Sequence, residues 1–281
     1  MSRVAAVIVT YNNAHMLRDL LGDLGAQSRP PDEIVVVDNA SSDGTEHEVR
    51  VNHPSARYVR LAENTGSAGG YHEGIRTALA TADFIWTLDD DVRLETRSLE
   101  LLLQGLETVS ASGRIGAVRS VGAGHPSALP TELDIVPWRG TLFPATVIRT
   151  AGLPEREYFL YGEDLEYSLR LKRLGYSFFW IPASRCIESR KGKVRFSVLG
   201  RPGEAYPTAW ALYYAFRNEA SIYLRYRGYA RLLRTMLYGL KVALYVCAAE
   251  RARCTAKLAA IARGLRDGCL DRLGRNQRYL P

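Results

Sequence analysis

Hydrophobic positions in the first half of the chain follow two alternating periods, one typical of buried strands and one typical of helices. Apolar runs of strand length occupy four segments: Val4–Thr10, Glu33–Asp38, Ala56–Leu61 and Phe84–Leu88. Between them, apolar residues at helical spacing predict one helix over Ala14–Gln27 and another from about Ala68 to Ala80. Strands that alternate with helices predict an α/β fold, built on a mostly parallel mixed sheet with helices on both faces.

The alternation weakens after residue 120. Gly, Pro and polar residues predict irregular structure over 120–158, with a short strand near Gly140–Ile148. A helix is predicted over Glu163–Leu174, where a glycine ends it, and a strand over Ser177–Ile181. The segment Ser184–Ala205 is basic and rich in Gly and Ser, and we expect it to form a mobile loop.

Charge divides the chain into two parts. Residues 201–281 hold 15 Lys or Arg against 5 Asp or Glu, whereas the whole chain has a net charge of +7, so the rest of the chain is mildly acidic. From Tyr206 onward the hydrophobic pattern is helical almost to the end. We therefore expect one globular domain over 1–205 and a helical, basic extension over 206–281.

The extension has two interpretations. Aromatic and leucine side chains recur at helical spacing over 223–245, with Arg and Lys between them. Such a helix can lie in a membrane interface, with its cations on anionic head groups. Alternatively, it forms a helical hairpin that packs on the body of the protein or on a second subunit of a homo-oligomer. No nucleic-acid-binding motif accompanies the charge, so we expect no RNA or DNA partner.

Cysteine usage and the N-terminus bear on the cellular compartment. The four cysteines are far apart without CxxC spacing, and the chain opens Met-Ser-Arg-Val without the pattern of a signal peptide. We expect a cytoplasmic protein, peripheral on the inner face of the membrane if the extension binds lipid. The segment closest to a membrane span, Leu232–Ala249, is interrupted by Arg234 and Lys241, and we expect it not to cross.

Three adjacent carboxylates, Asp89, Asp90 and Asp91, follow the strand over Phe84–Leu88. Neighbouring carboxylates repel each other by about 1 kcal/mol per pair in water, and by more when they are partly buried. Because side chains alternate along a strand, Asp89 and Asp91 face the same side and can offer oxygen ligands to Mg²⁺ or Mn²⁺. The alternative is a polar turn in which an aspartate caps a helix near Thr96–Ser112.

Polar residues also follow the other predicted strands, and in a parallel sheet these strand ends share one crevice. They are Thr10, Tyr11 and Asn12 after the first strand, Asp38 at the end of the second, and a glycine-rich turn with Asn64, Gly66, Gly69 and Gly70. A glycine-rich turn that opens a helix suits a phosphate group, and diphosphates commonly bind a divalent metal. The first strand lacks the Gly-x-Gly-x-x-Gly turn of dinucleotide-binding oxidoreductases.

Taken together, these motifs resemble the family 2 glycosyltransferases of the GT-A fold, over roughly residues 3–190. The resemblance rests on Thr10-Tyr11-Asn12, Val36-Val37-Asp38-Asn39-Ala40-Ser41-Ser42-Asp43-Gly44-Thr45, Asn64-x-Gly66-x-Ala68-Gly69-Gly70, Asp89-Asp90-Asp91 and Tyr161-Gly162-Glu163-Asp164-Leu165-Glu166. It implies a GT-A, Rossmann-like sheet and an inverting transfer of a sugar from a nucleotide-diphosphate sugar. The acceptor is then a hydroxyl of a glycan or of a lipid-linked molecule. Within the family, the motifs of this chain are most similar to those of rhamnosyl and galactofuranosyl transferases, so dTDP-rhamnose and UDP-galactofuranose are the favoured donors. In addition, Phe216-Arg217-Asn218 is similar to an aromatic-Arg-Asn element of these enzymes.

The resemblance also implies roles for individual residues. The nucleotide sugar would contact Thr10, Tyr11, Asn12, Asp38, Asn64, Gly66, Gly69, Gly70, Asp89 and Asp90. Asp89 and Asp91 would be the Asp-x-Asp pair that binds Mg²⁺ or Mn²⁺, with Asp91 as the direct ligand. Asp164 would be the catalytic base, with Glu163 beside it. The alternative for both acids is to stabilise the dipole of the helix in whose first turn they lie.

One departure concerns the metal. Many relatives place a histidine ligand after the strand that follows the base helix, but here no His occurs after His125. Either Glu188 replaces the imidazole, or the metal is held by Asp91, diphosphate and water alone. A basic cluster on the expected mobile loop, Arg190, Lys191, Lys193 and Arg195, either closes over the diphosphate or is a solvated loop.

The acceptor is expected to contact Trp138, Gly140 and Thr141, because relatives form the floor of the acceptor site at this place. Aromatic faces suit the apolar side of a sugar ring, although Trp138 fits a core position equally well. Two other functions remain as alternatives. A sugar-nucleotidyltransferase needs a Gly-rich, basic segment directly after the first strand, which is missing. A noncatalytic module that recruits partners to a membrane needs only the basic extension.

Overall fold

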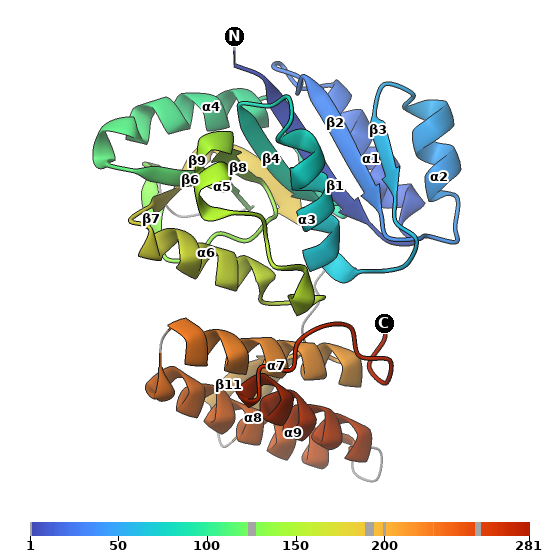
Figure 1. Ribbon diagram of the computed structural model, residues 1–281, viewed down its shortest axis with the longest axis vertical. Helices are drawn as coiled ribbons and strands as arrows, with labels where there is room; N and C mark the ends of the chain where they lie inside the picture. The colour runs from blue at the N-terminus through green and yellow to red at the C-terminus, as the bar shows by residue number, and fades with distance from the viewer. Residues whose placement is uncertain (1, 123–127, 189–193, 199–200, 227, 251–253) are drawn as a thin grey trace. The chain divides into compact units, whose positions relative to one another are not determined.

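The computed structural model describes residues 2–122, 128–188, 194–198, 201–226, 228–250 and 254–281. The chain forms two compact units (Figure 1). Unit 1 comprises Met1–Pro154 and Tyr167–Arg190, and unit 2 comprises Glu155–Glu166 and Lys191–Pro281. The predicted boundary between a domain over 1–205 and an extension over 206–281 is a statement about which segments fold independently. It stays a prediction.

Unit 1 is built on a mixed sheet, as the sequence predicts. Among the described residues, nine strands form it in the order β3-β2-β1-β4-β8-β6-β9-β5, with β7 paired to β9. Their bounds are β1 Val4–Thr10, β2 Glu33–Asp38, β3 Arg57–Arg60, β4 Phe84–Asp89, β5 Val92–Leu94, β6 Ile115–Val121, β7 Thr131–Leu133, β8 Thr141–Pro144 and β9 Ser177–Glu188. The strands β3, β2, β1 and β4 run parallel, whereas β8 is antiparallel to both of its neighbours.

Helices cover both faces of this sheet because β1 carries apolar side chains on both sides. Val4, Ala6 and Ile8 pack in the cluster that contains α1 (Ala14–Gly25) and α4 (Ser98–Val109). The alternate residues Ala5 and Val7 pack in a second cluster. That cluster also holds residues of α3 (Gly66–Ala78), α5 (Ala145–Ala151) and the unit 1 part of α6 (Glu163–Arg173). The shorter turns are α2 Thr45–His47, η1 Glu48–Asn52, η2 Ser110–Ser112 and η3 Arg156–Tyr158.

Unit 2 contains the predicted helical extension. Its helices are α7 Ala209–Tyr226, α8 Tyr229–Glu250 and α9 Thr255–Cys269, and its hairpin consists of β10 Val194–Val198 and β11 Arg201–Ala205. The helices α7 and α9 approach closely because α9 presents glycines. A Cβ atom added at Gly268 would lie 2.1 Å from the carbonyl oxygen of Arg217, and one added at Gly264 would lie 2.6 Å from that of Tyr213.

Two local predictions were wrong. The expected mobile loop over 184–205 contains strands in its described parts, because β9 continues to Glu188 by pairing with β5 and β10 pairs with β11. The expected strand over 140–148 ends at Pro144, after which α5 begins. The strand β6 was not predicted, although it lies in the middle of the sheet.

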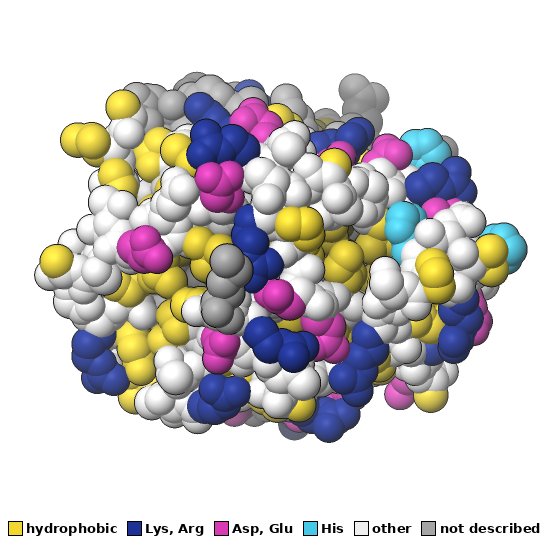
Figure 2. Space-filling model, turned by 90° about the horizontal axis from the view of Figure 1, so that it is seen from above, with side chains coloured by type: hydrophobic (Ala, Val, Ile, Leu, Met, Phe, Trp, Pro, Cys, Tyr) yellow, Lys and Arg dark blue, Asp and Glu magenta, His cyan; other side chains and the backbone are white. Residues whose placement is uncertain are grey.

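Charged side chains of both signs are interspersed on the face shown in Figure 2. Ion pairs such as Arg93 with Asp23 at 2.7 Å and Arg97 with Glu100 at 2.8 Å join residues of unit 1. Exposed pairs of this kind contribute about 0–1 kcal/mol each to stability.

Candidate active site

The strand order brings several predicted site residues to one edge of the sheet. In the register of the parallel strands, Thr10 of β1 lies opposite Asp38 of β2, and Val9 lies opposite Asp89 of β4. Parallel strands end at the same edge, so the polar residues after β1, β2 and β4 are neighbours. We call Thr10–Asn12, Asp38 and Asp89–Asp91 the strand-end site.

Asp38 is fully buried, and its carboxylate is held by the protein itself. It accepts hydrogen bonds from the amide of Ser41 at 2.8 Å, from Arg60 at 2.9 Å and from the phenol of Tyr58. Burial, and then this hydrogen bond, raise the pKa of Tyr58 to about 12. These contacts fix the loop that follows β2 and give the strand-end site a rigid wall.

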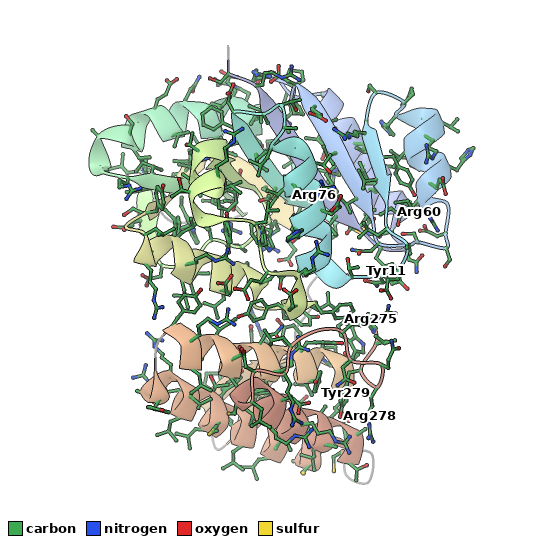
Figure 3. All side chains as sticks on the ribbon, in the orientation of Figure 1. Tyr11, Arg60, Arg76, Arg275, Arg278 and Tyr279 are labelled. Carbon is green, nitrogen blue, oxygen red and sulfur yellow. The ribbon has the colours of Figure 1, made fainter. Side chains whose placement is uncertain are left out.

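Asn12 joins the end of β1 to the same loop. It adopts a left-handed conformation with φ 50°, its amide donates to the hydroxyl of Ser41 at 2.9 Å, and its side-chain oxygen accepts from the amide of Ser42 at 2.7 Å. The neighbouring Tyr11 is 42% exposed and lies at the same end of the sheet as Arg60 (Figure 3). An exposed aromatic ring in this place suits stacking on a planar base.

The glycine-rich turn has a packing role in the structure. The side-chain oxygen of Asn64 accepts a hydrogen bond from the amide of Gly66 at 2.8 Å, and Gly66 has φ 72°. A Cβ atom added at Gly69 would lie 2.3 Å from the hydroxyl oxygen of Thr65, and one added at Gly70 would lie 2.4 Å from a methyl group of Val9. Gly70 therefore lets α3 pack closely on β1, whereas Gly69 leaves room for the side chain of Thr65 at the start of the helix. Contact of these glycines with a ligand stays a prediction.

The first two aspartates of the triplet contact different elements. Asp89 accepts a hydrogen bond from the phenol of Tyr71 on α3 at 2.7 Å, whereas Asp90 accepts one from the hydroxyl of Thr10 at 2.7 Å. Burial raises the pKa of Asp89, and burial with the charges of Asp91 and Asp89 raises the pKa of Asp90 to about 6. Burial and the neighbouring carboxylates therefore disfavour the charged forms of these side chains, and a bound cation would offset that cost.

The metal ligands are only partly assembled. Among the described residues, no group of three or more His, Cys, Asp and Glu side chains lies close enough together to hold a metal ion. Glu188 at the end of β9 pairs with Arg139 at 2.6 Å, so its charge is already neutralised. The oxygen-rich triplet fits Mg²⁺ or Mn²⁺ chemically, with a diphosphate completing the coordination. Whether Asp91, diphosphate and water alone or also Glu188 hold the metal stays a prediction.

The three residues expected to bind the acceptor are buried in unit 1. Trp138 is 4% exposed and its ring centroid lies 5.0 Å from that of Tyr71, as expected of a core residue. Gly140 packs against Cys186, and the hydroxyl of Thr141 donates to the carbonyl of Pro137 at 2.6 Å. This burial agrees with the core alternative for Trp138, and contact of the three residues with an acceptor stays a prediction.

Glu163 and Asp164 start α6 in unit 2, after a loop (155–162) with unusual backbone geometry. Phe159 and Tyr161 both have φ 64°, and Gly162 has φ 84°. Left-handed conformations cost non-glycine residues about 1–2 kcal/mol each. Glu163 is buried, whereas Asp164 is half-buried and its carboxylate accepts a hydrogen bond from the amide of Leu165 at 2.7 Å.

The segment Phe216-Arg217-Asn218 of α7 holds this loop in place. The amide nitrogen of the Asn218 side chain donates to the carbonyls of Tyr158 and Leu160 at 2.9 Å each, and to that of Tyr161. The guanidinium of Arg217 donates to the carbonyl of Tyr158 at 2.7 Å and to that of Gly274. The sequence marked this element by resemblance but did not reveal its role, since the contacts span about sixty residues. The only local signal was a charged residue and an amide on the apolar face of a helix.

The basic cluster is largely outside the described part of the chain. Arg190, Lys191 and Lys193 lie outside the described residues. Arg195 is described, and its side chain pairs with Glu204 at 3.3 Å across the hairpin β10–β11.

Comparisons with known sequences agree with the motifs. The family model for glycosyl transferase family 2 matches residues 5–144. Galactofuranosyltransferase GlfT1 of Mycolicibacterium smegmatis is 30% identical over 203 residues, which cover 62% of this chain and 67% of that protein. The undecaprenyl-phosphate mannosyltransferase of Micrococcus luteus is 28% identical over 235 residues, 75% of this chain and 94% of that protein.

Solved structures share the fold. The mannosyltransferase PcManGT of Pyrobaculum calidifontis, in complex with GDP-Man and Mn²⁺, has a TM-score of 0.59 at 18% identity, and the match covers 96% of this chain and 88% of that one. GalNAc-T7 with UDP, GalNAc and Mn²⁺ has a TM-score of 0.60 at 13% identity over 80% of this chain. The chain spans about half the length of GalNAc-T7, at 48%.

Removal of the Asn218 side chain should reduce turnover more than donor affinity. The Asn218→Ala variant leaves buried carbonyls of the loop without their donor, at a cost of about 1–3 kcal/mol each. A displaced loop should lower kcat by about 10–100-fold, since a shift of 1 Å at a reacting group can cost this much. Steady-state kinetics and donor calorimetry measure the two effects.

The matched control is Asn276→Ala, which removes a hydrogen bond donated to Tyr213 and one accepted from the amide of Arg278, both in unit 2 and neither to the loop. It should lower stability while kcat stays near the wild-type value. Equal loss of kcat in both variants would show that Asn218 acts only through global stability.

Proposed function

The chain belongs to glycosyl transferase family 2, and we propose that it transfers galactofuranose from UDP-galactofuranose, with inversion, to a hydroxyl of a glycan or lipid-linked acceptor. The observation that carries this proposal is the strand-end site, in a chain that is 30% identical to a galactofuranosyltransferase. Family membership makes the chain a glycosyltransferase that uses a nucleotide sugar, rather than a nucleotidyltransferase or a noncatalytic module.

The strand-end site suits the nucleotide diphosphate. The exposed ring of Tyr11 offers a stacking surface for the base, and the residues held around Asp38 would line the site of the nucleoside. Asp91, together with the diphosphate, would hold Mg²⁺ or Mn²⁺, with Asp89 and Asp90 adding negative charge nearby. The metal, when bound, neutralises charge on the leaving diphosphate.

Asp164 is the proposed base. It removes the proton from the acceptor hydroxyl, which attacks the anomeric carbon from the face opposite the diphosphate, so that the configuration inverts. Phe216-Arg217-Asn218 fixes the backbone immediately before this residue, which keeps the carboxylate in one position. Glu163 is buried beside it and has a supporting role at the start of α6.

We also propose that α8 binds an anionic membrane surface. One side of this helix is buried in unit 2 at Leu232, Gly239 and Val246, whereas other apolar side chains are exposed, including Leu233 at 57% and Leu240 at 60%. Arg231 and Arg234 are exposed on the same helix and complement anionic head groups. By length and composition α8 also reaches the range of a membrane span, with 28% of its most apolar window buried.

The proposed reaction predicts release of UDP from UDP-galactofuranose when the full chain is incubated with Mn²⁺ and methyl β-D-galactofuranoside. The Asp164→Asn variant should lower kcat by about 10²–10⁴-fold, with donor affinity nearly unchanged, because only the proton transfer is lost. Coupled measurement of UDP release and calorimetry follow the two quantities. Near-normal turnover of the variant would reject Asp164 as the base, and absence of UDP release by the wild type would reject the donor.

Metal removal should abolish tight donor binding. In calorimetry with UDP and Mn²⁺, the heat of binding should disappear with EDTA, and Asp91→Ala should behave in the presence of Mn²⁺ as the wild type does with EDTA. Glu188→Gln serves as the control, since Arg139 already neutralises that carboxylate. If Glu188→Gln loses Mn²⁺-dependent binding and Asp91→Ala keeps it, the assignment of the ligand is reversed.

Vesicle flotation tests the membrane proposal. The protein should float with vesicles that contain phosphatidylglycerol, and salt should weaken this binding because head-group attraction is electrostatic. Leu240→Glu should reduce flotation, whereas Leu129→Glu, at a leucine that is 73% exposed in unit 1, should not. No flotation of the wild type, together with a dimeric mass by light scattering that Leu240→Glu converts to a monomer, would assign this face to a second subunit.

A further inference from the structure

A cavity of about 210 Å³ lies within unit 2. The strand β11 and helices α7 and α8 line it, with Glu204, Tyr206, Phe216, Glu219, Tyr238 and Val242 among the lining residues. Its volume is below the roughly 300–1,000 Å³ of pockets that hold drug-sized ligands. The cavity therefore suits one small ring better than an extended chain.

Tyr206 connects this cavity with the start of α6. Its ring centroid lies 4.3 Å from that of Tyr161, which precedes Gly162, Glu163 and Asp164 in the sequence. Burial raises the pKa of the Tyr206 phenol, and the nearby groups Tyr161, Asp164 and Glu219 raise it further. The cavity and the proposed base thus share one neighbourhood inside unit 2.

The lining residues combine two kinds of chemistry. The aromatic rings of Tyr206, Phe216 and Tyr238 suit the apolar face of a sugar. The carboxylate of Glu204 pairs with Arg195 at 3.3 Å, whereas that of Glu219 already accepts one hydrogen bond, from the hydroxyl of Thr235 at 3.3 Å. A carboxylate has acceptor capacity for several hydrogen bonds, so Glu219 can also accept from a ligand hydroxyl group. The Glu219 carboxylate repels a phosphate, and a purely apolar chain would gain no hydrogen bonds from it. A neutral, hydroxyl-rich ring satisfies both kinds of side chain.

We propose that this cavity is the subsite for a neutral sugar ring of the acceptor. The proposal rests on the proposed function, and it connects the acceptor with the start of α6 through the contact between Tyr206 and Tyr161. It also offers the acceptor a cavity, whereas Trp138, Gly140 and Thr141 are buried. Glu219 is its specificity-determining residue, since it lies on α7 three residues after Phe216 and both line the cavity.

Two variants test the subsite in the full chain, with methyl β-D-galactofuranoside as acceptor and UDP-galactofuranose as donor. Glu219→Gln removes a charged hydrogen-bond acceptor, and the KM for the acceptor should rise by about tenfold or more. Ala215→Phe fills the cavity, because Ala215 lines it, and should raise the same KM. Hydrolysis of the donor without acceptor, and the KM for the donor, should stay at wild-type values in both variants.

Glu250→Gln is the matched control, because Glu250 pairs with Lys257 outside the cavity and its loss should leave the acceptor KM unchanged. An unchanged acceptor KM in Glu219→Gln overturns the proposal. The proposal also fails if only Ala215→Phe impairs transfer, because this result indicates an apolar ligand. It fails as well if donor hydrolysis falls in parallel with transfer, because this result indicates a purely structural role of the cavity.

Direct binding separates failure of the subsite from failure of the proposed function. If the wild type releases no UDP, saturation-transfer NMR with methyl β-D-galactofuranoside still reports on the cavity. Saturation transfer that is present in the wild type and in Glu250→Gln, and lost in Glu219→Gln and Ala215→Phe, supports the subsite. Absence of saturation transfer in the wild type overturns it.

Discussion

The parallel pairing of β1 with β2 and β4 is the constraint on which the strand-end site depends. This register places Thr10 opposite Asp38 and aligns Val9 with Asp89, so residues that are up to 80 positions apart share one edge. The sheet is covered by helices on both faces. Gly70 and Gly74 let α3 lie so close to β1 that an added Cβ atom would collide with the side chain of Val9 or Val7. A larger residue there would displace the helix that carries Tyr71, the partner of Asp89.

The loop before α6 shows how a costly backbone conformation is maintained. Residues with positive φ and carbonyl groups without donors would favour rearrangement, but the carbonyls of Tyr158, Leu160 and Tyr161 all accept hydrogen bonds from one amide group on Asn218. The adjacent Arg217 is fully buried, and burial lowers the pKa of its guanidinium. Its hydrogen bonds to carbonyls compensate part of the desolvation cost, which makes α7 and this loop one rigid element.

The local hydrophobic periodicity was sufficient to predict the strands that are buried on both sides and the helices that are amphipathic. The bounds of β1 and β2 agree with the predicted ones residue for residue, and the mixed sheet and helical extension were also predicted. Strands that depend on distant partners were missed: β6 lies between β8 and β9, and β5 exists through pairing with the end of β9. The role of Asn218 was missed for the same reason, because its hydrogen-bond partners lie 57–60 residues earlier in the sequence.

The two units divide the proposed chemistry in a way that bears on specificity. The strand-end site, with its carboxylates and the exposed Tyr11, belongs to unit 1, whereas Asp164 and the cavity around Tyr206 and Glu219 belong to unit 2. We therefore expect substitutions in the cavity to leave the strand register of unit 1 unchanged. Because α7 supplies Phe216 and Glu219 to the cavity and Asn218 to the loop before α6, one helix contacts both the proposed acceptor subsite and the loop that precedes the proposed base. Substitutions on α7 that alter the preferred acceptor must therefore also preserve the position of the loop before α6, on which the proposed proton transfer depends.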